Sequence, residues 1–126
     1  MNTPDIITEL EPGQVFVFGS NTEGIHAGGA AAVAHQNFGA SWGQGEGLQG
    51  DSYAIPTMGS LDELGQAVAR FLKFAATRPD LTFLVTKIGT GIAGHPTVLV
   101  ARYFAARLDN VILPTEFETA LAGARS

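Results

Sequence analysis

The chain has 126 residues, no cysteine and a formal net charge of −5, with 7 Lys and Arg against 12 Asp and Glu. This length is typical of one domain with a continuous core, so we expect a single domain over residues 1–126. The absence of Cys excludes a disulfide scaffold, thiol catalysis and a Cys-ligated zinc site. The scarcity of basic residues argues against an extended nucleic-acid surface. A small phosphorylated ligand stays open, because backbone amides bind phosphate without basic side chains.

The start of the chain lacks the basic and apolar segments of a signal peptide. No apolar run approaches the roughly 18 residues that a membrane span needs. We therefore expect a cytoplasmic protein that has no membrane partner.

Short apolar runs alternate with helical patterns along the chain. A polar lead-in over 5–11 predicts an edge strand or a turn that ends at Pro12-Gly13. The expected strands are 15–18, 52–56, 82–88 and 110–114. Helices are expected over 29–36, 97–107 and 115–122. A further helix is expected to start at the capping box Ser60-Leu-Asp-Glu63 and to end before Arg78-Pro79. Residues 39–51 are expected to form a loop. This alternation predicts the α/β class, with a mostly parallel sheet and helices on both of its faces.

Two glycine-rich loops each follow a predicted strand, one from Phe18 to Gly29 and one from Gly89 to Gly94. The order strand, glycine loop, helix presents backbone N–H groups to an anion such as a phosphate. Ligands of parallel sheets bind at the carboxyl ends of the strands, where both loops fall. Ten of the 16 glycines lie between Gly19 and Gly59, which favours a ligand-binding region, although a long irregular surface loop is the alternative.

The segment Gly89-Thr-Gly-Ile-Ala-Gly94 fits the dinucleotide fingerprint G-x-G-x-x-G. That fingerprint should open the first βαβ unit, but only about 30 residues follow it here. A second match, at 45–50, precedes a strand instead of a helix. The chain contains no G-x-x-x-x-G-K-[ST] phosphate-binding loop. These patterns argue against a Rossmann or P-loop nucleotide site.

The arrangement instead resembles the macrodomains, which bind ADP-ribose and related nucleotides. The likeness rests on Val15-Phe-Val-Phe-Gly-Ser-Asn21, on His26-Ala-Gly-Gly-Ala-Ala31 and, most specifically, on Gly89-Thr-Gly-Ile-Ala-Gly-His-Pro96. The middle segment, 43–57, is similar to a phage-associated and bacterial branch of macrodomain-like proteins. The likeness covers residues 15–114. It implies a three-layer macrodomain-like fold and, as a partner, ADP-ribose, a related nucleotide or an ADP-ribosylated macromolecule, with no cofactor or metal.

The resemblance also implies roles for individual residues. The backbones of Gly28–Gly29 and Gly89–Gly94 would hold the diphosphate. The residues expected to bind ligand are Gly19, Ser20, Gly28, Gly29, Ala30, Gln44, Gly89, Thr90, Gly91, Ile92, Ala93, Gly94 and His95. The residues expected to act in catalysis are Asn21 at the distal ribose, Glu46 or Asp51 as general base, and His26 as acid or base.

Each of these polar residues also has a simpler interpretation. Asn21 would stabilise its own loop as an Asx turn, and His95 would only precede a helix. A lone loop histidine such as His26, and loop carboxylates such as Glu46 and Asp51, are commonly solvated.

The sequence departs from the macrodomain pattern at two places. Phe18 stands where many macrodomain hydrolases have the first of two Asn residues. Ala31 or Ala32 stands where one hydrolase subgroup has a catalytic Asp, so that subgroup's mechanism is not implied here.

Three functions follow as alternatives. The first is a domain that binds ADP-ribose or a related NAD-derived nucleotide, with hydrolysis of ADP-ribosyl linkages left open. The second is a non-catalytic module of a phage or defence system that senses or sequesters a nucleotide, and the third is a purely structural domain.

Overall fold

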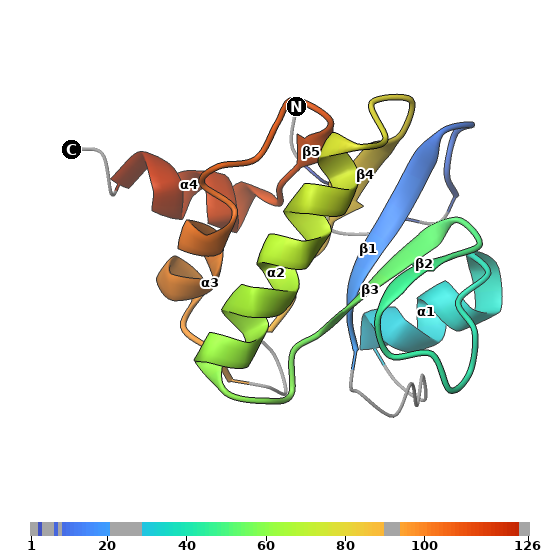
Figure 1. Ribbon diagram of the computed structural model, residues 1–126, viewed down its shortest axis with the longest axis horizontal. Coiled ribbons are helices and arrows are strands. Elements are labelled where there is room, and N and C mark those ends of the chain that lie inside the picture. Colours follow the sequence, from blue (N-terminus) through green and yellow to red (C-terminus); the bar gives the residue numbers. More distant parts are fainter. Residues whose placement is uncertain (1–2, 4–6, 8, 21–28, 90–93, 124–126) are drawn as a thin grey trace.

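A computed structural model describes residues 3, 7, 9–20, 29–89 and 94–123. Within these residues, five strands form one sheet and four helices surround it (Figure 1). The strands are β1 (Gln14–Ser20), β2 (Gly47–Gln49), β3 (Ser52–Pro56), β4 (Thr82–Val85) and β5 (Val111–Ile112). The helices are α1 (Gly29–Asn37), α2 (Leu61–Ala76), α3 (Thr97–Tyr103) and α4 (Thr115–Gly123). The predicted α/β class is confirmed.

The sheet has the strand order β2-β3-β1-β4-β5. Strands β3, β1, β4 and β5 are parallel, and only β2 runs antiparallel to its neighbour β3. Ser20, the last residue of β1, lies opposite Pro56, the last residue of β3. The carboxyl ends of the parallel strands therefore share one edge of the sheet, which we call the carboxyl edge, and the opposite edge is the amino edge.

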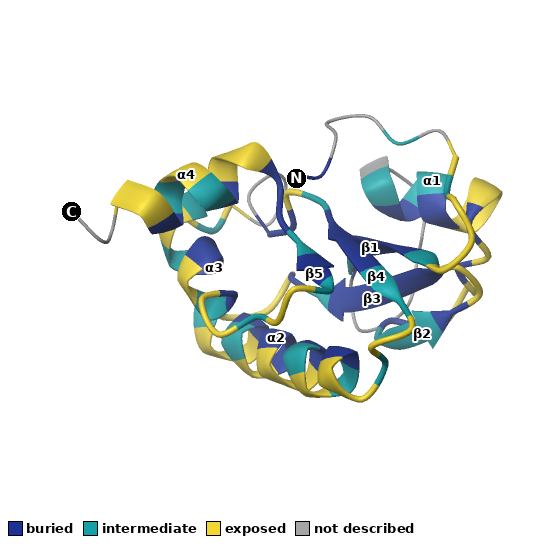
Figure 2. Cartoon of the chain, turned by 90° about the horizontal axis from the view of Figure 1, so that it is seen from above, coloured by how far each residue is buried: buried dark blue, intermediate teal, exposed yellow. Residues whose placement is uncertain are grey.

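The side chains of β1 alternate between the two faces of the sheet. Val15 and Val17 join a core that includes buried residues of α2, α3 and α4. Phe16 and Phe18 join a smaller core with Ala31, Ala34 and Phe38, on the side where α1 lies. Figure 2 shows the sheet between α1 and α2. Helices thus cover both faces, as the sequence predicts.

The capping box that the sequence predicts opens α2. The Ser60 hydroxyl accepts from the Glu63 N–H over 3.1 Å, and the Glu63 carboxylate accepts from the Ser60 N–H over 3.1 Å. The apolar face of the helix is buried, with Leu64, Ala67, Val68, Phe71 and Ala75 directed at the sheet. The helix ends at the cap residue Thr77.

Several predicted boundaries are wrong, and the last strand is shorter than expected, since β5 covers only Val111–Ile112 of 110–114. The expected loop 39–51 contains β2, a three-residue edge strand too short to show alternation. Strand β4 ends at Val85 instead of continuing to residue 88, because the chain turns where the Ile88 N–H donates to the Thr86 carbonyl. Helix α3 ends at Tyr103 instead of 107, since the following N–H groups donate three residues back, from Phe104 to Ala101 for example.

The described part of the lead-in 5–11 forms no named strand, whereas Thr3 makes an isolated parallel bridge to Pro114. A search of the described helices found none with the length and apolar character needed to cross a bilayer.

Candidate functional site

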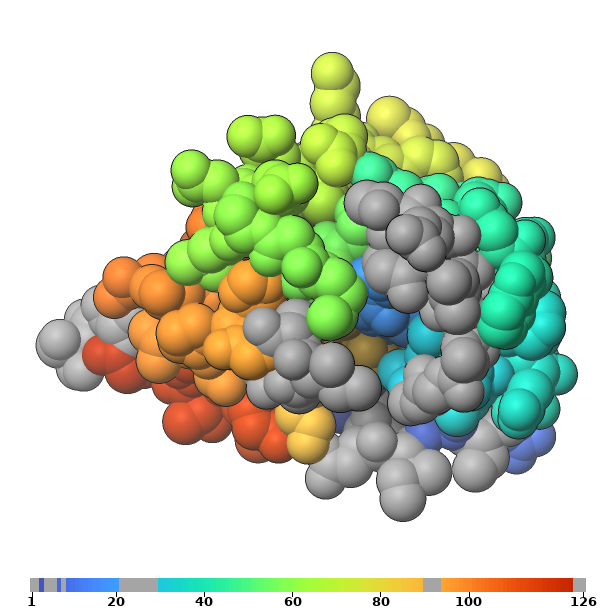
Figure 3. Space-filling model, turned by 90° about the horizontal axis from the view of Figure 1, so that it is seen from below, coloured from blue at the N-terminus to red at the C-terminus, as the bar shows by residue number. Residues whose placement is uncertain are grey.

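The two glycine loops leave the sheet at its carboxyl edge, as the sequence predicts. Strand β1 reaches this edge at Gly19-Ser20, β3 at Pro56-Thr57, and the chain after β4 at Ile88-Gly89. Figure 3 looks onto this edge, where atoms from the end of β1 (blue) show between α1 (cyan) and the start of α2 (green). Three separate stretches of sequence therefore meet at one place.

Gly19 lies close to both Thr57 and Gly89. A Cβ placed on Gly19 would lie 3.1 Å from Thr57 Oγ1 and 3.7 Å from the Gly89 backbone nitrogen. Thr57 is buried, and its backbone N–H donates to the Ser20 carbonyl over 2.8 Å. The predicted ligand residues Gly19, Ser20 and Gly89 are thus brought together.

Gly89 is required by its backbone conformation and by its surroundings. Its φ is +73°, a value that residues with a Cβ rarely adopt, and an added Cβ would lie 3.1 Å from Leu64 Cδ2. Gly94, at the far end of the same loop, also has a positive φ, +71°, but no atom of the described residues lies within 4 Å of an added Cβ. The loop therefore uses glycine at both of its described ends.

His95 connects this loop to the loop after β3. Its backbone N–H donates to the Gly89 carbonyl over 2.8 Å, so the two ends of the 89–95 segment are joined directly. Its ring Nε2 lies 2.9 Å from the carbonyl oxygen of Thr57. In the simpler interpretation His95 only precedes a helix. The structure shows that it also bonds to Gly89, in the loop after β4, and to Thr57, after β3.

Several predicted site residues lie outside the described residues: Asn21, His26, Gly28, Thr90, Gly91, Ile92 and Ala93. Gly29 and Ala30 begin α1, which packs on β1. Their roles, and those of the residues outside the description, stay predictions.

The two candidate carboxylates lie in different places, one beside α2 and one at the amino edge. Glu46 precedes β2 and accepts two hydrogen bonds from the Arg70 guanidinium of α2, at 2.6 and 3.0 Å. Asp51 lies in the turn before β3 and therefore at the amino edge, where its backbone bonds to Phe16 and Phe38. The structure does not bring Asp51 together with Gly19 and Gly89.

The Gln44 amide is used inside its own loop. Its Nε2 donates weakly to the carbonyls of Glu46 and Leu48, each over 3.3 Å. Gln49, which is buried, accepts from the Ser41 N–H over 2.7 Å. These amides stabilise the path of the 41–49 segment.

Tyr53 lies close to the charges of Glu46 and Arg70. Burial, followed by the nearby Glu46 charge, raises the pKa of Tyr53 to about 12. The Tyr53 ring packs edge-on against Phe71, with ring centroids 4.9 Å apart. Tyr53 is therefore a core residue, and so is Phe38, whereas Trp42 is 57% exposed.

Phe18, the departure at the end of β1, is fully buried in the core beneath α1. Its ring stacks near that of Phe16, with centroids 6.3 Å apart. A polar Asn would have no place among these apolar side chains. Ala31 is buried in the same cluster, which accounts for the small apolar residue there.

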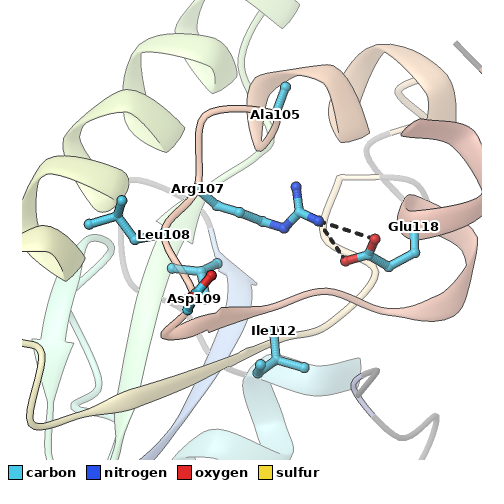
Figure 4. A pocket seen from close by; sticks show the side chains of 7 residues that line it. Ala105, Arg107, Leu108, Asp109, Ile112 and Glu118 are labelled. Atoms are coloured by element: carbon cyan, nitrogen blue, oxygen red, sulfur yellow. Dashed lines mark hydrogen bonds and ion pairs between the residues drawn. The ribbon is translucent and has the colours of Figure 1, made fainter. Parts of the chain in front are cut away.

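A hollow of about 360 Å³ lies at the amino end of β5, against α4 (Figure 4). Two of its charged lining groups pair with each other, because the Arg107 guanidinium donates to both Glu118 carboxylate oxygens, at 2.9 and 3.1 Å. It lies at the amino edge, away from the glycine loops. No cluster of His, Asp or Glu suited to a metal ion occurs among the described residues.

Comparisons with protein-family models, with curated proteins and with solved structures found no match for this chain.

Proposed function

We propose that this chain is a macrodomain-like domain that binds ADP-ribose, or a close NAD-derived nucleotide, at the carboxyl edge of its sheet. The observation that carries the proposal is the close approach of two glycine loops, seen in the 3.7 Å between an added Gly19 Cβ and the Gly89 nitrogen. Backbone this free of side chains lets a ligand come near its N–H groups. A diphosphate is long enough to contact both loops at once.

The ligand class is supported by the sequence pattern together with this position. The pattern Gly89-Thr-Gly-Ile-Ala-Gly-His-Pro96 resembles the macrodomain loop, and its described ends lie at the edge where parallel sheets bind ligands. The net charge of −5 fits a ligand held by backbone groups better than one held by many Lys and Arg side chains.

Calorimetry with ADP-ribose and AMP tests the proposal. We expect saturable binding of ADP-ribose and much weaker binding of AMP, because AMP lacks the second phosphate and the distal ribose. Equal affinity for the two would mean that one loop contributes nothing. Absence of binding by both would reject the proposal.

A second candidate function is binding without hydrolysis, as in a module that senses or sequesters a nucleotide. The pairing of Glu46 with Arg70 favours it, because both carboxylate oxygens accept hydrogen bonds from the guanidinium and are not free to accept a proton from a substrate or a water molecule. Glu63 and Glu116, which lie near the carboxyl edge, are also engaged, in the capping box and with Lys87 at 3.1 Å.

The hydrolase alternative then relies on Asn21, on His26 or on the substrate diphosphate itself. A single-turnover assay on mono-ADP-ribosylated protein and nucleic acid separates the two functions. Release of ADP-ribose would support hydrolysis, and tight ADP-ribose binding without release from either substrate would support the sensor.

A further inference from the structure

Consecutive hydrogen bonds join the ends of β1 and β3 to the loop after β4 at the carboxyl edge. The Thr57 N–H donates to the Ser20 carbonyl over 2.8 Å, which joins the ends of β3 and β1. The ring of His95 then bonds to the Thr57 carbonyl over 2.9 Å. The His95 N–H finally bonds to the Gly89 carbonyl over 2.8 Å. His95 is the only residue in this series that uses a side-chain nitrogen, so it can be changed by mutation without altering the backbone groups.

The partner of the His95 ring decides which ring nitrogen carries hydrogen. A carbonyl oxygen only accepts hydrogen bonds, so Nε2 must be the donor to Thr57. In the neutral ring the hydrogen is then on Nε2 and absent from Nδ1. The ring edge also packs near Gly89, since His95 Cδ2 would lie 3.4 Å from a Cβ added there. The ring is thus held between Gly89 and the segment that follows β3.

We infer that His95 is a positioning residue, which sets the spacing of the two glycine loops through its Nε2–H bond to Thr57. This inference rests on the proposed function and assigns His95 a role other than direct ligand contact through that nitrogen. A diphosphate that contacts both loops needs them at a fixed separation, and a site held in advance avoids the entropy cost of ordering loops during binding.

Two amide substitutions separate positioning from direct contact. In Gln the side-chain amide nitrogen is the same number of bonds from Cα as Nε2 of His, and in Asn it matches Nδ1. His95→Leu removes both nitrogens. We expect His95→Leu to weaken ADP-ribose binding about fivefold, the loss of one hydrogen bond, and His95→Gln to restore most of the affinity. His95→Asn should bind as weakly as His95→Leu.

Tyr103→Phe is the matched control. The Tyr103 hydroxyl donates to the Leu61 carbonyl over 3.2 Å, so this variant also removes a side-chain bond to a main-chain carbonyl, here between α3 and α2. It touches neither the ends of β1 and β3 nor the loop after β4. It should lower the free energy of unfolding and leave the affinity for ADP-ribose unchanged.

A readout without ligand keeps this inference separate from the proposed function. Nitrogen-15 NMR of the free wild-type protein, recorded at a pH where the ring is neutral, should show the His95 ring hydrogen on Nε2. Exchange of the Thr57 amide hydrogen should become faster in His95→Leu, return toward wild type in His95→Gln, and stay at the wild-type rate in Tyr103→Phe.

A hydrogen on Nδ1, or rescue of affinity by Asn instead of Gln, would overturn the positioning role. So would an unchanged Thr57 exchange rate in His95→Leu. If the wild-type protein does not bind ADP-ribose, the proposed function fails, and the tautomer and the exchange rates still decide whether His95 holds the loops together.

Discussion

The Glu46 carboxylate and the Arg70 guanidinium form a two-bond ion pair, with N–O distances of 2.6 and 3.0 Å. The pair joins the segment before β2 to the outer side of α2, and the Arg70 side chain is 53% exposed. Its geometry holds the 41–49 segment near the helix. We therefore regard Glu46 as a structural residue.

Glu46→Gln should leave ADP-ribose binding unchanged. Gln keeps the shape and loses the charge, and because the pair is largely exposed, we expect a stability loss of less than about 1 kcal/mol. Asp51→Asn should bind equally well, since Asp51 lies at the amino edge. Calorimetry and urea unfolding check both variants. A large loss of affinity, or of any hydrolytic rate, in either one would return that carboxylate to the site.

Gly89→Ala should weaken both stability and ADP-ribose binding. A Cβ at φ +73° costs about 1–2 kcal/mol, and here it would also approach Leu64 and the His95 ring, at 3.1 and 3.4 Å. Gly13→Ala is the control, because Gly13 has φ +83° but lies before β1, at the amino edge. It should lose stability and keep its affinity. Equal affinities of the two variants for ADP-ribose would show that Gly89 is not part of the binding site.

The sequence predicts the parts of this architecture that depend on residues close together in the chain, and it does not predict those that depend on residues far apart. The capping box at Ser60 and the glycine loops are local patterns, and they fall where expected because neighbouring residues decide them. The Glu46–Arg70 pair and the His95–Thr57 bond join residues 24 and 38 positions apart, and no local pattern signals them. Thr57 was identifiable only by its place directly after a strand. The sequence does not predict strand β2, because its pairing with β3 and the close approach of Gly39 and Gly50, not its composition, keep it in place.

The contact between Gly39 and Gly50 predicts that a substitution of Gly50 strongly lowers the stability of the protein. A Cβ on Gly50 would lie 2.8 Å from Gly39 Cα and 2.9 Å from the Gly39 carbonyl oxygen. Both of these Gly39 atoms belong to the backbone, so they cannot rotate away from the new Cβ as the end of a side chain can. Gly50→Ala should destabilise the protein by more than the about 1–2 kcal/mol that φ +60° alone would cost.

Gly43→Ala provides the comparison for Gly50→Ala. Gly43 has φ +91°, and within the described part of the chain nothing lies within 4 Å of its added Cβ. It should therefore show the conformational cost alone. Urea unfolding measures both variants, and equal losses would mean that the Gly39 contact relaxes without cost.

The capping box makes part of the stability depend on pH. Hydrogen bonds from the Ser60 backbone and side chain lower the pKa of Glu63 below its usual 4.5. Because the folded pKa is the lower one, the stabilisation is present above pH 4.5 and is lost as pH falls through the folded value. The difference in free energy of unfolding between wild type and Glu63→Gln should be constant from neutral pH to about 4.5 and shrink below it. A difference that grows on acidification would contradict this assignment.

The central claim is that a nucleotide diphosphate binds where the two glycine loops meet. Titration of nitrogen-15-labelled protein with ADP-ribose, followed by amide NMR, tests it residue by residue. We predict saturable shifts for the amides of Gly19, Thr57 and Gly89 and none for Asp109, which lines the hollow at the amino edge. Shifts confined to the amino edge, or no shifts at any ADP-ribose concentration, would contradict the account.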